Sequence, residues 1–355
     1  MIADRSVVRS FDLPDDRAAT EPPEARGLAR DGVRLLVADP GGLHHVTFRD
    51  FPRYLRPGDL VVVNTSATLP AAIDGRRRGG WPVVIHFSSR LDDGTWAVEL
   101  RTPDVSGPLR DGASGERIRL DGGGELEVVS AYNGLEGRSR LLRVAPNGFR
   151  VEPYLERFGR PITYHYLQGR YPLAMYQTIF ARDPGSAEMP SAGRPFTSEL
   201  VTQMASRGIR LAPILLHAGV SSLERGEGPL PERFRVPPET ARLVNGTRAA
   251  GGVVIAVGTT VTRALETVAD ERDNVSPAEG WTELVLSPNR PARVVDGIVT
   301  GWHAPDASHQ LLLEAVVGPA LVDRAYAAAL GNGYLWHEFG DSCLLLPDAA
   351  PPLSR

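Results

Sequence analysis

The distribution of apolar and polar residues divides the chain into two regions of different texture. In the larger region, continuous apolar runs alternate with amphipathic stretches that end at glycine or proline. The run 60–63 consists of Leu and Val only, which is typical of a strand buried on both faces. The strands expected in this region are 33–38, 60–63, 210–216, 253–257 and 283–286. The helices expected are 197–207, 237–250, 262–269, 307–317 and 321–330.

Strands that alternate with helices predict an α/β domain with mostly parallel strands. Between residues 73 and 151 the texture changes to short alternating runs separated by Gly, Asp and Arg. Regular turn signals between short strands are typical of a small antiparallel barrel or sandwich. We therefore expect residues 1–72 and 152–355 to form a large, barrel-like α/β domain. Residues 73–151 are expected to be inserted into it as a small antiparallel β-barrel.

Composition narrows the class of protein. All 39 basic residues among the 355 are arginine, so no lysine is present to form a Schiff base or act as a general base. Cys343 is the only cysteine, which excludes a disulfide within the chain and fits a reducing compartment. No apolar run approaches the roughly 20 residues of a membrane helix, and the N-terminal residues lack a secretory pattern. We expect a cytoplasmic protein without a membrane partner.

The charge balance gives little support for a nucleic-acid partner. The net charge is −4 and the isoelectric point is about 6.1. Proteins that bind nucleic acid often carry a basic excess, because neutralised phosphates supply much of the affinity. A local basic patch is still compatible with a negative net charge, because the distribution of charge matters more than its total. The run 76–78 is three arginines between glycines, which could contact phosphate or form a solvated hairpin tip.

Three segments place small or polar residues directly after a predicted strand, where parallel sheets bind ligands. In the first, Gly258, Thr259 and Thr260 follow the strand 253–257 and precede a helix. Backbone N–H groups at a helix start attract an anion or a carboxylate, but a threonine that caps the helix explains the same pattern. The absence of Gly-x-Gly-x-x-Gly argues against a dinucleotide site.

The other two segments contain histidines. His217 follows the strand 210–216 and could be an acid–base group, or it could be structural. Trp302 and His303 lie in a loop before a helix. Trp302 could stack on a base or pack in the core, and His303 could act as a general base. We expect His309 on the surface of the following helix, and no metal site, because the histidines lack a recognised ligand spacing.

Taken in order, these segments match a known set of motifs. Residues 48–64 are similar to Phe-Arg-Asp…Leu-Arg-Pro-Gly-Asp-Leu…Asn, and residues 256–260 to the Gly-Thr-Thr motif that is the most distinctive. Further matches are 176–178, 190–197, 216–219, 295–305 and 340–341. The combination resembles the S-adenosylmethionine:tRNA ribosyltransferase-isomerases of queuosine biosynthesis over nearly the whole chain.

The resemblance implies a large α/β domain with an inserted small β-barrel, and S-adenosylmethionine as a substrate without a metal. The family transfers and isomerises the ribosyl part of S-adenosylmethionine onto 7-aminomethyl-7-deazaguanine in tRNA. The product is epoxyqueuosine, and adenine and methionine leave. The resemblance implies catalytic roles for His303, His217 and Thr260. The residues implied in binding S-adenosylmethionine are Gly258, Thr259, Arg263, Ser191, Ala192, Gly193, Thr300 and Trp302.

The sequence departs from the family pattern inside these motifs. Where the family has Asn-Asp-Thr-Arg/Lys-Val, residues 64–68 read Asn-Thr-Ser-Ala-Thr, and its Pro-Ala-Arg is Pro-Ala-Ala at 70–72. The Ser-Thr after Pro305 is replaced by a segment that ends at His309. The closing Tyr-Arg-Phe-Phe-Ser-Tyr-Gly-Asp becomes Tyr-Leu-Trp-His-Glu-Phe-Gly-Asp at 334–341. Such changes suggest a retained scaffold with an altered pocket.

Two alternative functions therefore accompany the tRNA reaction. In the first, the protein uses S-adenosylmethionine with a small-molecule acceptor, or cleaves it without tRNA. In the second, it is a non-catalytic paralogue that binds S-adenosylmethionine or RNA. The sequence does not decide between these acceptors, and it leaves the oligomeric state open.

Overall fold

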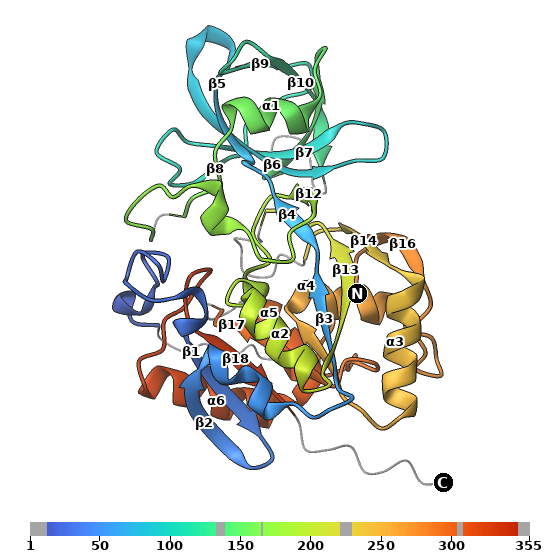
Figure 1. Ribbon diagram of the computed structural model, residues 1–355. Coiled ribbons are helices and arrows are strands. Elements are labelled where there is room, and N and C mark those ends of the chain that lie inside the picture. Colours follow the sequence, from blue (N-terminus) through green and yellow to red (C-terminus); the bar gives the residue numbers. More distant parts are fainter. Residues whose placement is uncertain (1–12, 133–138, 165, 221–228, 304–307, 347–355) are drawn as a thin grey trace.

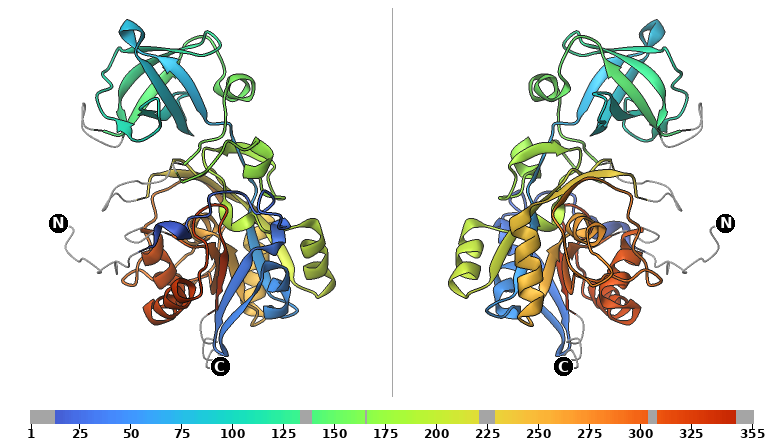
Figure 2. Two further views of the ribbon diagram at one scale, coloured as in Figure 1. Left: turned by 90° about the vertical axis from the view of Figure 1, so that its left-hand side faces the viewer. Right: turned by 90° about the vertical axis from the view of Figure 1, so that its right-hand side faces the viewer.

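The computed structural model describes residues 13–132, 139–164, 166–220, 229–303 and 308–346. A small β-barrel lies above a large α/β domain, and the two views of Figure 2 show the same separation (Figures 1 and 2). The helices are α1 (Val151–Phe158), α2 (Ser198–Ser206), α3 (Pro238–Ala249), α4 (Thr259–Thr267), α5 (Ser308–Val317) and α6 (Pro319–Gly331).

The barrel is closed by antiparallel pairs only. Its strands are β5 (Ala72–Arg76), β6 (Pro82–Arg90), β7 (Trp96–Arg101), β8 (Pro108–Leu109), β9 (Arg117–Leu120), β10 (Glu125–Tyr132) and β11 (Leu141–Pro146). They are ordered β11-β10-β9-β5-β6-β7-β8, and β11 also pairs with β7, which closes a ring of six strands. The predicted fold class, α/β with an inserted antiparallel barrel, is confirmed. The domain boundaries at 72/73 and 151/152 stay a prediction.

The large domain is built on a nine-stranded sheet. Its strands are β1 (Arg34–Asp39), β2 (Gly42–Thr47), β3 (Leu60–Asn64), β13 (Arg210–Leu216), β14 (Glu232–Val236), β15 (Val254–Val257), β16 (Ala278–Thr282), β17 (Gly297–Gly301) and β18 (Ser342–Leu345). They are ordered β16-β14-β13-β3-β15-β17-β18-β1-β2. The strands β13, β3, β15 and β17 are parallel neighbours, and β18 and β1 form a further parallel pair. The pairs β13–β14, β14–β16, β17–β18 and β1–β2 are antiparallel. The sheet is therefore mixed, and the expectation of mostly parallel strands holds for the four neighbouring strands β13, β3, β15 and β17.

Helices cover both faces of this sheet, because the central strands are apolar on both sides. In β3, Val61 and Val63 pack on the face covered by α2 and the 3₁₀ helix at Phe48–Tyr54. Leu60 and Val62 point to the other face, which α3 and α4 cover. Helices α5 and α6 continue that second layer over β17, β18 and β1 (Figure 2). The alternation of side chains along each strand thus fills two cores at once.

The connections between the domains include a second pair of strands. The strands β4 (Ser66–Thr68) and β12 (Asp183–Ser186) are parallel and lie between the barrel and the large sheet (Figure 1). At the far end of the barrel, the β5–β6 hairpin contains the arginine run. Arg76 and Arg78 are exposed there, and Arg77 is paired with Glu116 and Asp111.

Two expected elements differ from the structure. The segment 283–286 is not a strand, because the chain leaves the sheet after β16 and turns Leu284 and Leu286 inward as a loop. The helix expected at 262–269 begins earlier, at Thr259. The helix expected at 307–317 is α5, and Ala307 lies outside the described residues. Within the parts of the chain that the structure describes, no helix is long and apolar enough to span a membrane.

Glu266 on α4 is a buried carboxylate that fixes the segment before β17. It accepts hydrogen bonds from the N–H groups of Arg293, Val294 and Val295, each at 2.9 Å. We predict that Glu266→Ala lowers the free energy of unfolding by about 2–4 kcal/mol, because it leaves buried donors without partners. Chemical denaturation measures this, with the exposed Glu271→Ala as the control. A loss no larger than that of the control would contradict this role.

Candidate active site

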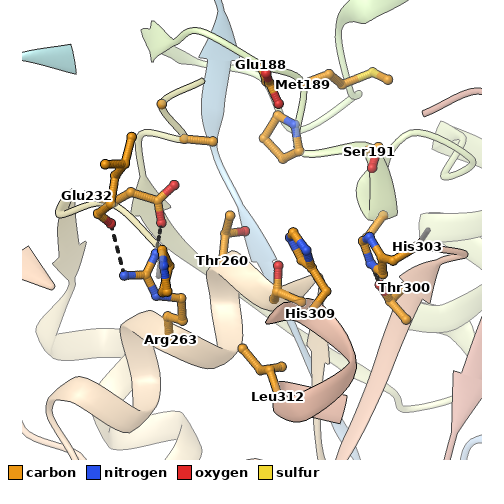
Figure 3. Close-up of a pocket in the computed structure, with 18 of the residues that line it drawn as sticks. Glu188, Met189, Ser191, Glu232, Thr260, Arg263, Thr300, His303, His309 and Leu312 are labelled. Atoms are coloured by element: carbon orange, nitrogen blue, oxygen red, sulfur yellow. Dashed lines mark hydrogen bonds and ion pairs between the residues drawn. The ribbon is translucent and has the colours of Figure 1, made fainter. Parts of the chain in front are cut away.

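The carboxyl ends of the four parallel strands meet at one edge of the large sheet. Loops that follow β13, β15 and β17 surround a cavity of about 200 Å³ there (Figure 3). The other walls come from the β12–α2 connection at Glu188–Ala192, from the start of β14, from the loop after β16, from α5 and from Glu338 before β18. Segments that are distant in sequence thus contribute to one site, as is usual for open α/β sheets.

Helix α4 begins at the wall of this cavity. Gly258 has φ 93°, a left-handed value that favours glycine, and an added Cβ would lie 3.2 Å from the Cβ of Ala192. The Gly258 N–H donates to the Val299 carbonyl at 2.8 Å, so it still belongs to the sheet. Thr259 and Thr260 are the first residues of α4 and line the cavity. Backbone N–H groups in the first turn of a helix have no acceptor within the helix. This end of the helix therefore provides donors for an anionic group.

Asn64, the last residue of β3, fixes the geometry of this edge. Its Nδ2 donates to the Leu216 carbonyl at 2.8 Å, and its Oδ1 accepts from the Leu216 N–H at 3.0 Å. The same Nδ2 lies 3.4 Å from the Thr260 Oγ1, and the Ser66 N–H donates to Oδ1 at 3.0 Å. One buried amide therefore connects the ends of β3 and β13 with the start of α4.

Arg263, one turn into α4, is held by protein groups. Its Nη1 forms an ion pair with Glu232, and the rest of its guanidinium donates to the carbonyls of Leu284 at 3.0 Å, Thr282 at 3.1 Å and Leu230 at 3.2 Å (Figure 3). Burial raises the pKa of Glu232, and the positive charge of Arg263 opposes that shift. The pair closes one wall of the cavity and leaves Arg263 little capacity to bind a ligand carboxylate.

Two histidines form the opposite wall. The rings of His303 and His309 are stacked with centroids 4.2 Å apart and planes 7° apart. The Nε2 of His303 lies 3.0 Å from the Thr300 Oγ1. Burial lowers the pKa of His303 well below its usual range and that of His309 to about 4, so both imidazoles are neutral at neutral pH.

The charged side chains that line the cavity are mainly acidic. They are Glu188, Glu232 and Glu338 with Arg263 as the counter-charge. Burial raises the pKa of Glu338 to about 7, and its Oε2 is shielded from solvent without a hydrogen-bond partner among the described residues. Because three carboxylates and one guanidinium line the cavity, its lining favours a cationic ligand.

Comparison with known proteins identifies the family. Residues 9–345 match the profile described as queuosine biosynthesis protein. The chain belongs to this family. Its relatives include the S-adenosylmethionine:tRNA ribosyltransferase-isomerases of Symbiobacterium thermophilum and Acidiphilium cryptum. Both are 35% identical to the chain. The alignment with the Symbiobacterium protein covers 95% of this chain and 98% of that protein, and the alignment with the Acidiphilium protein covers 94% of this chain and 97% of that protein.

A solved structure supports the same conclusion. The S-adenosylmethionine tRNA ribosyltransferase from Thermotoga maritima is 27% identical, covers 95% of this chain and 99% of its own, and has a TM-score of 0.52. The predicted resemblance to this family of transferases and isomerases is therefore confirmed.

The resemblance implied a set of catalytic and S-adenosylmethionine-binding residues. Most of them line the cavity described above. They are Ser191, Ala192, Gly258, Thr259, Thr260, Arg263, Thr300 and His303. Gly193 does not line it, although its neighbours Ser191 and Ala192 do. The individual roles of these residues stay predictions.

Trp302 and His217 lie away from the cavity. Trp302 is 1% exposed and packs edge-on against Tyr326 and Tyr334, with centroids 5.1 and 5.8 Å away. The structure therefore gives its ring the core-packing role and no face for a ligand. His217 accepts or donates a hydrogen bond with the Ser66 Oγ at 2.8 Å, and burial lowers its pKa to about 4. It joins the end of β13 to β4, although Ala218 and Gly219 after it line the cavity.

Several cavity residues were not expected from the sequence. His309 lines the cavity, so its expected position on the helix surface is wrong. Glu188 and Glu338 carried no signal of their own, although Glu338 lies in a stretch that departs from the family pattern. Within the described parts of the chain no cluster of three or more His, Cys, Asp or Glu is arranged to hold a metal ion. A reaction without metal stays a prediction.

The Arg263–Glu232 pair can be tested for a structural role. We predict that Arg263→Met lowers the free energy of unfolding by about 3–5 kcal/mol, because it leaves a buried carboxylate uncompensated. The double variant Arg263→Met/Glu232→Gln should lose less than the sum of the two single changes. Denaturation of the four proteins gives the coupling energy, with the exposed Arg235→Met as the control. Unchanged stability with weaker ligand binding would instead make Arg263 a ligand-binding residue.

Proposed function

We propose that this protein transfers and isomerises the ribosyl part of S-adenosylmethionine onto 7-aminomethyl-7-deazaguanine in tRNA, giving epoxyqueuosine and releasing adenine and methionine. The observation that carries the proposal is an acidic cavity at the carboxyl edge of the sheet in a member of the queuosine biosynthesis family. The relatives at 35% identity are named for this transfer. We expect the reaction to take place in the cytoplasm.

The charges of the cavity suit the charges of S-adenosylmethionine. The sulfonium and the amino group of that molecule are cationic, and the carboxylates of Glu188 and Glu338 line the cavity that would receive them. The methionine carboxylate is anionic, and the N-terminus of α4 at Thr259 and Thr260 offers donors for it. These contacts would orient the ribose relative to the acid–base groups.

The chemistry requires a base, an anchored nucleoside and exclusion of water. The reaction begins with removal of a proton from the ribose 5′ carbon, which the adjacent sulfonium makes acidic. Ring opening expels adenine, the acceptor amine attacks, and epoxide closure expels methionine. His303, held by Thr300, is an acid–base candidate in the cavity, and the Thr260 hydroxyl is a second polar group that can face the nucleoside.

One observation favours the alternative acceptor, a small molecule. The net charge is −4, and Ala67 in β4 and Ala72 at the start of the barrel stand where the family pattern has basic side chains, which reduces the positive charge available to tRNA phosphates. The same scaffold could then cleave S-adenosylmethionine without tRNA. A non-catalytic paralogue would bind S-adenosylmethionine or RNA and release nothing.

A single assay separates these functions. The purified protein is incubated with S-adenosylmethionine, with and without tRNA that carries the deazaguanine base, and adenine and methionine are quantified. We predict release only with that tRNA, and tRNA without the modified base is the control. Release without tRNA would support the small-molecule alternative. Binding of S-adenosylmethionine without release would support the non-catalytic alternative.

A further inference from the structure

Glu338 is presented to the cavity by a tightly constrained turn. His337 before it has φ 74°, a left-handed value that is strained for a residue with a side chain, and its ring stacks on Tyr166 with centroids 4.3 Å apart. An added Cβ at Gly340 would lie 2.4 Å from the Leu335 carbonyl oxygen, so the turn requires glycine there. The Asp341 carboxylate accepts from the Leu335 N–H at 2.9 Å and closes the turn.

This turn places a carboxylate where little solvent reaches it. Glu338 lines the main cavity and also a second space of about 10 Å³, which it shares with Arg194, Asp341 and Ser342. A space of that size holds about one water molecule. The Glu338 Oε2 has no hydrogen-bond partner in the described part of the chain. A buried polar atom without a partner is uncommon, and at a cavity wall it indicates a ligand contact.

We propose that Glu338 is the base that removes the proton from the 5′ carbon of S-adenosylmethionine. In this step the C5′–H bond breaks, the proton forms an O–H bond with the Glu338 carboxylate, and the electron pair stays on C5′ beside the sulfonium. No oxidant or further reactant is needed. The inference rests on the proposed function, and it assigns to Glu338 the role that the resemblance gave to His303 or His217. Glu338 stands where the family pattern has serine, so this base is specific to this chain and belongs to its altered pocket.

The relative basicity of the cavity groups supports this assignment. Burial raises the pKa of Glu338 to about 7, whereas burial lowers the pKa of His309 to about 4 and that of His303 well below its usual range. A base works best when its pKa is close to the working pH. The neutral imidazoles are therefore weaker proton acceptors than the carboxylate. His217 does not line the cavity at all.

The surroundings of Glu338 fix the sign of the pH dependence. Several titratable or charged groups line the two spaces together with Glu338: Glu188, Glu232, Arg263, His303, His309, His337, Arg194 and Asp341. Tyr164 is buried nearby and interacts electrostatically with Glu338. Because burial raises the pKa, Glu338 is protonated and inactive below about pH 7 and ionised above it. A bound sulfonium cation favours the ionised form and lowers this pKa.

The test is the pair of variants Glu338→Gln and Glu338→Asp. We expect Glu338→Gln to lower kcat by about 100-fold to 10,000-fold, which is the range of general base catalysis. The affinity for S-adenosylmethionine, measured by calorimetry, should fall by a much smaller factor than kcat, because Glu338 contributes only part of the negative charge in the cavity. In the wild type, kcat/KM should fall below about pH 7, and the acid limb of kcat should lie at lower pH. Glu338→Asp keeps the carboxylate and should retain this acid limb at reduced kcat.

Two comparisons make the result specific. Glu279→Gln makes the same chemical change at an exposed position on β16 and should leave kcat unchanged. Glu188→Gln removes another carboxylate of the cavity and should weaken S-adenosylmethionine binding while the acid limb remains. Circular dichroism establishes that each variant is folded, and the pH profile of Glu338→Asp tests the proposal even if Glu338→Gln unfolds.

The outcomes also distinguish this inference from the proposed function. If the wild type releases adenine and methionine but Glu338→Gln keeps its kcat, or raises only KM, the assignment of the base is wrong and the function stands. An acid limb that survives in folded Glu338→Gln contradicts the assignment in the same way. If the wild type binds S-adenosylmethionine and releases nothing with any acceptor, the proposed function and this inference are both wrong.

Discussion

The parallel alignment of β13, β3, β15 and β17 is the constraint on which the site depends. Four strands that run in one direction end together, and the loops after them must satisfy backbone groups without another strand. Asn64 does this for the ends of β3 and β13 and also contacts Thr260 at the start of α4. Gly258 permits the sharp change from strand to helix. The start of α4 therefore faces the cavity because the sheet ends there. The positions of the other side chains in the cavity depend on this arrangement.

The ion pair between Arg263 and Glu232 shows how the site obtains its net charge. Burying a carboxylate and a guanidinium together costs solvation, which the attraction and the three carbonyl contacts of Arg263 offset. The pair closes the wall next to the loop after β16 and neutralises the arginine. The carboxylates of Glu188 and Glu338 line the same cavity and make its lining acidic. A local field of this sign arises although the chain as a whole has a charge of only −4.

The sequence predicted the central elements better than the cavity wall, for physical reasons. Runs such as 60–63 are apolar on both faces, so the sequence alone was enough to predict these strands and the loops that follow them. Gly258, Thr260 and His303 line one cavity as expected. The segment 283–286 is also largely apolar but is a loop, whose leucines pack into the core with Leu312 and Leu313 and whose Leu284 carbonyl accepts a hydrogen bond from Arg263. Glu338 could not be predicted, since its position depends on a left-handed His337 and on contacts with Arg34 and Leu335 through Asp341.

The balance of charge in the first chemical step explains why a carboxylate suits this cavity better than an imidazole. A carboxylate beside a sulfonium forms an ion pair, and proton transfer converts that pair into a neutral acid and a neutral ylide. An imidazole that takes the same proton becomes a cation in a buried site, where desolvation already lowers the pKa of His303 and His309. The stacked histidines would then have to tolerate a positive charge 4.2 Å from a neighbouring ring. Neutral histidines are instead suited to hydrogen bonding with the nucleoside, and the carboxylates that line the cavity attract the cation.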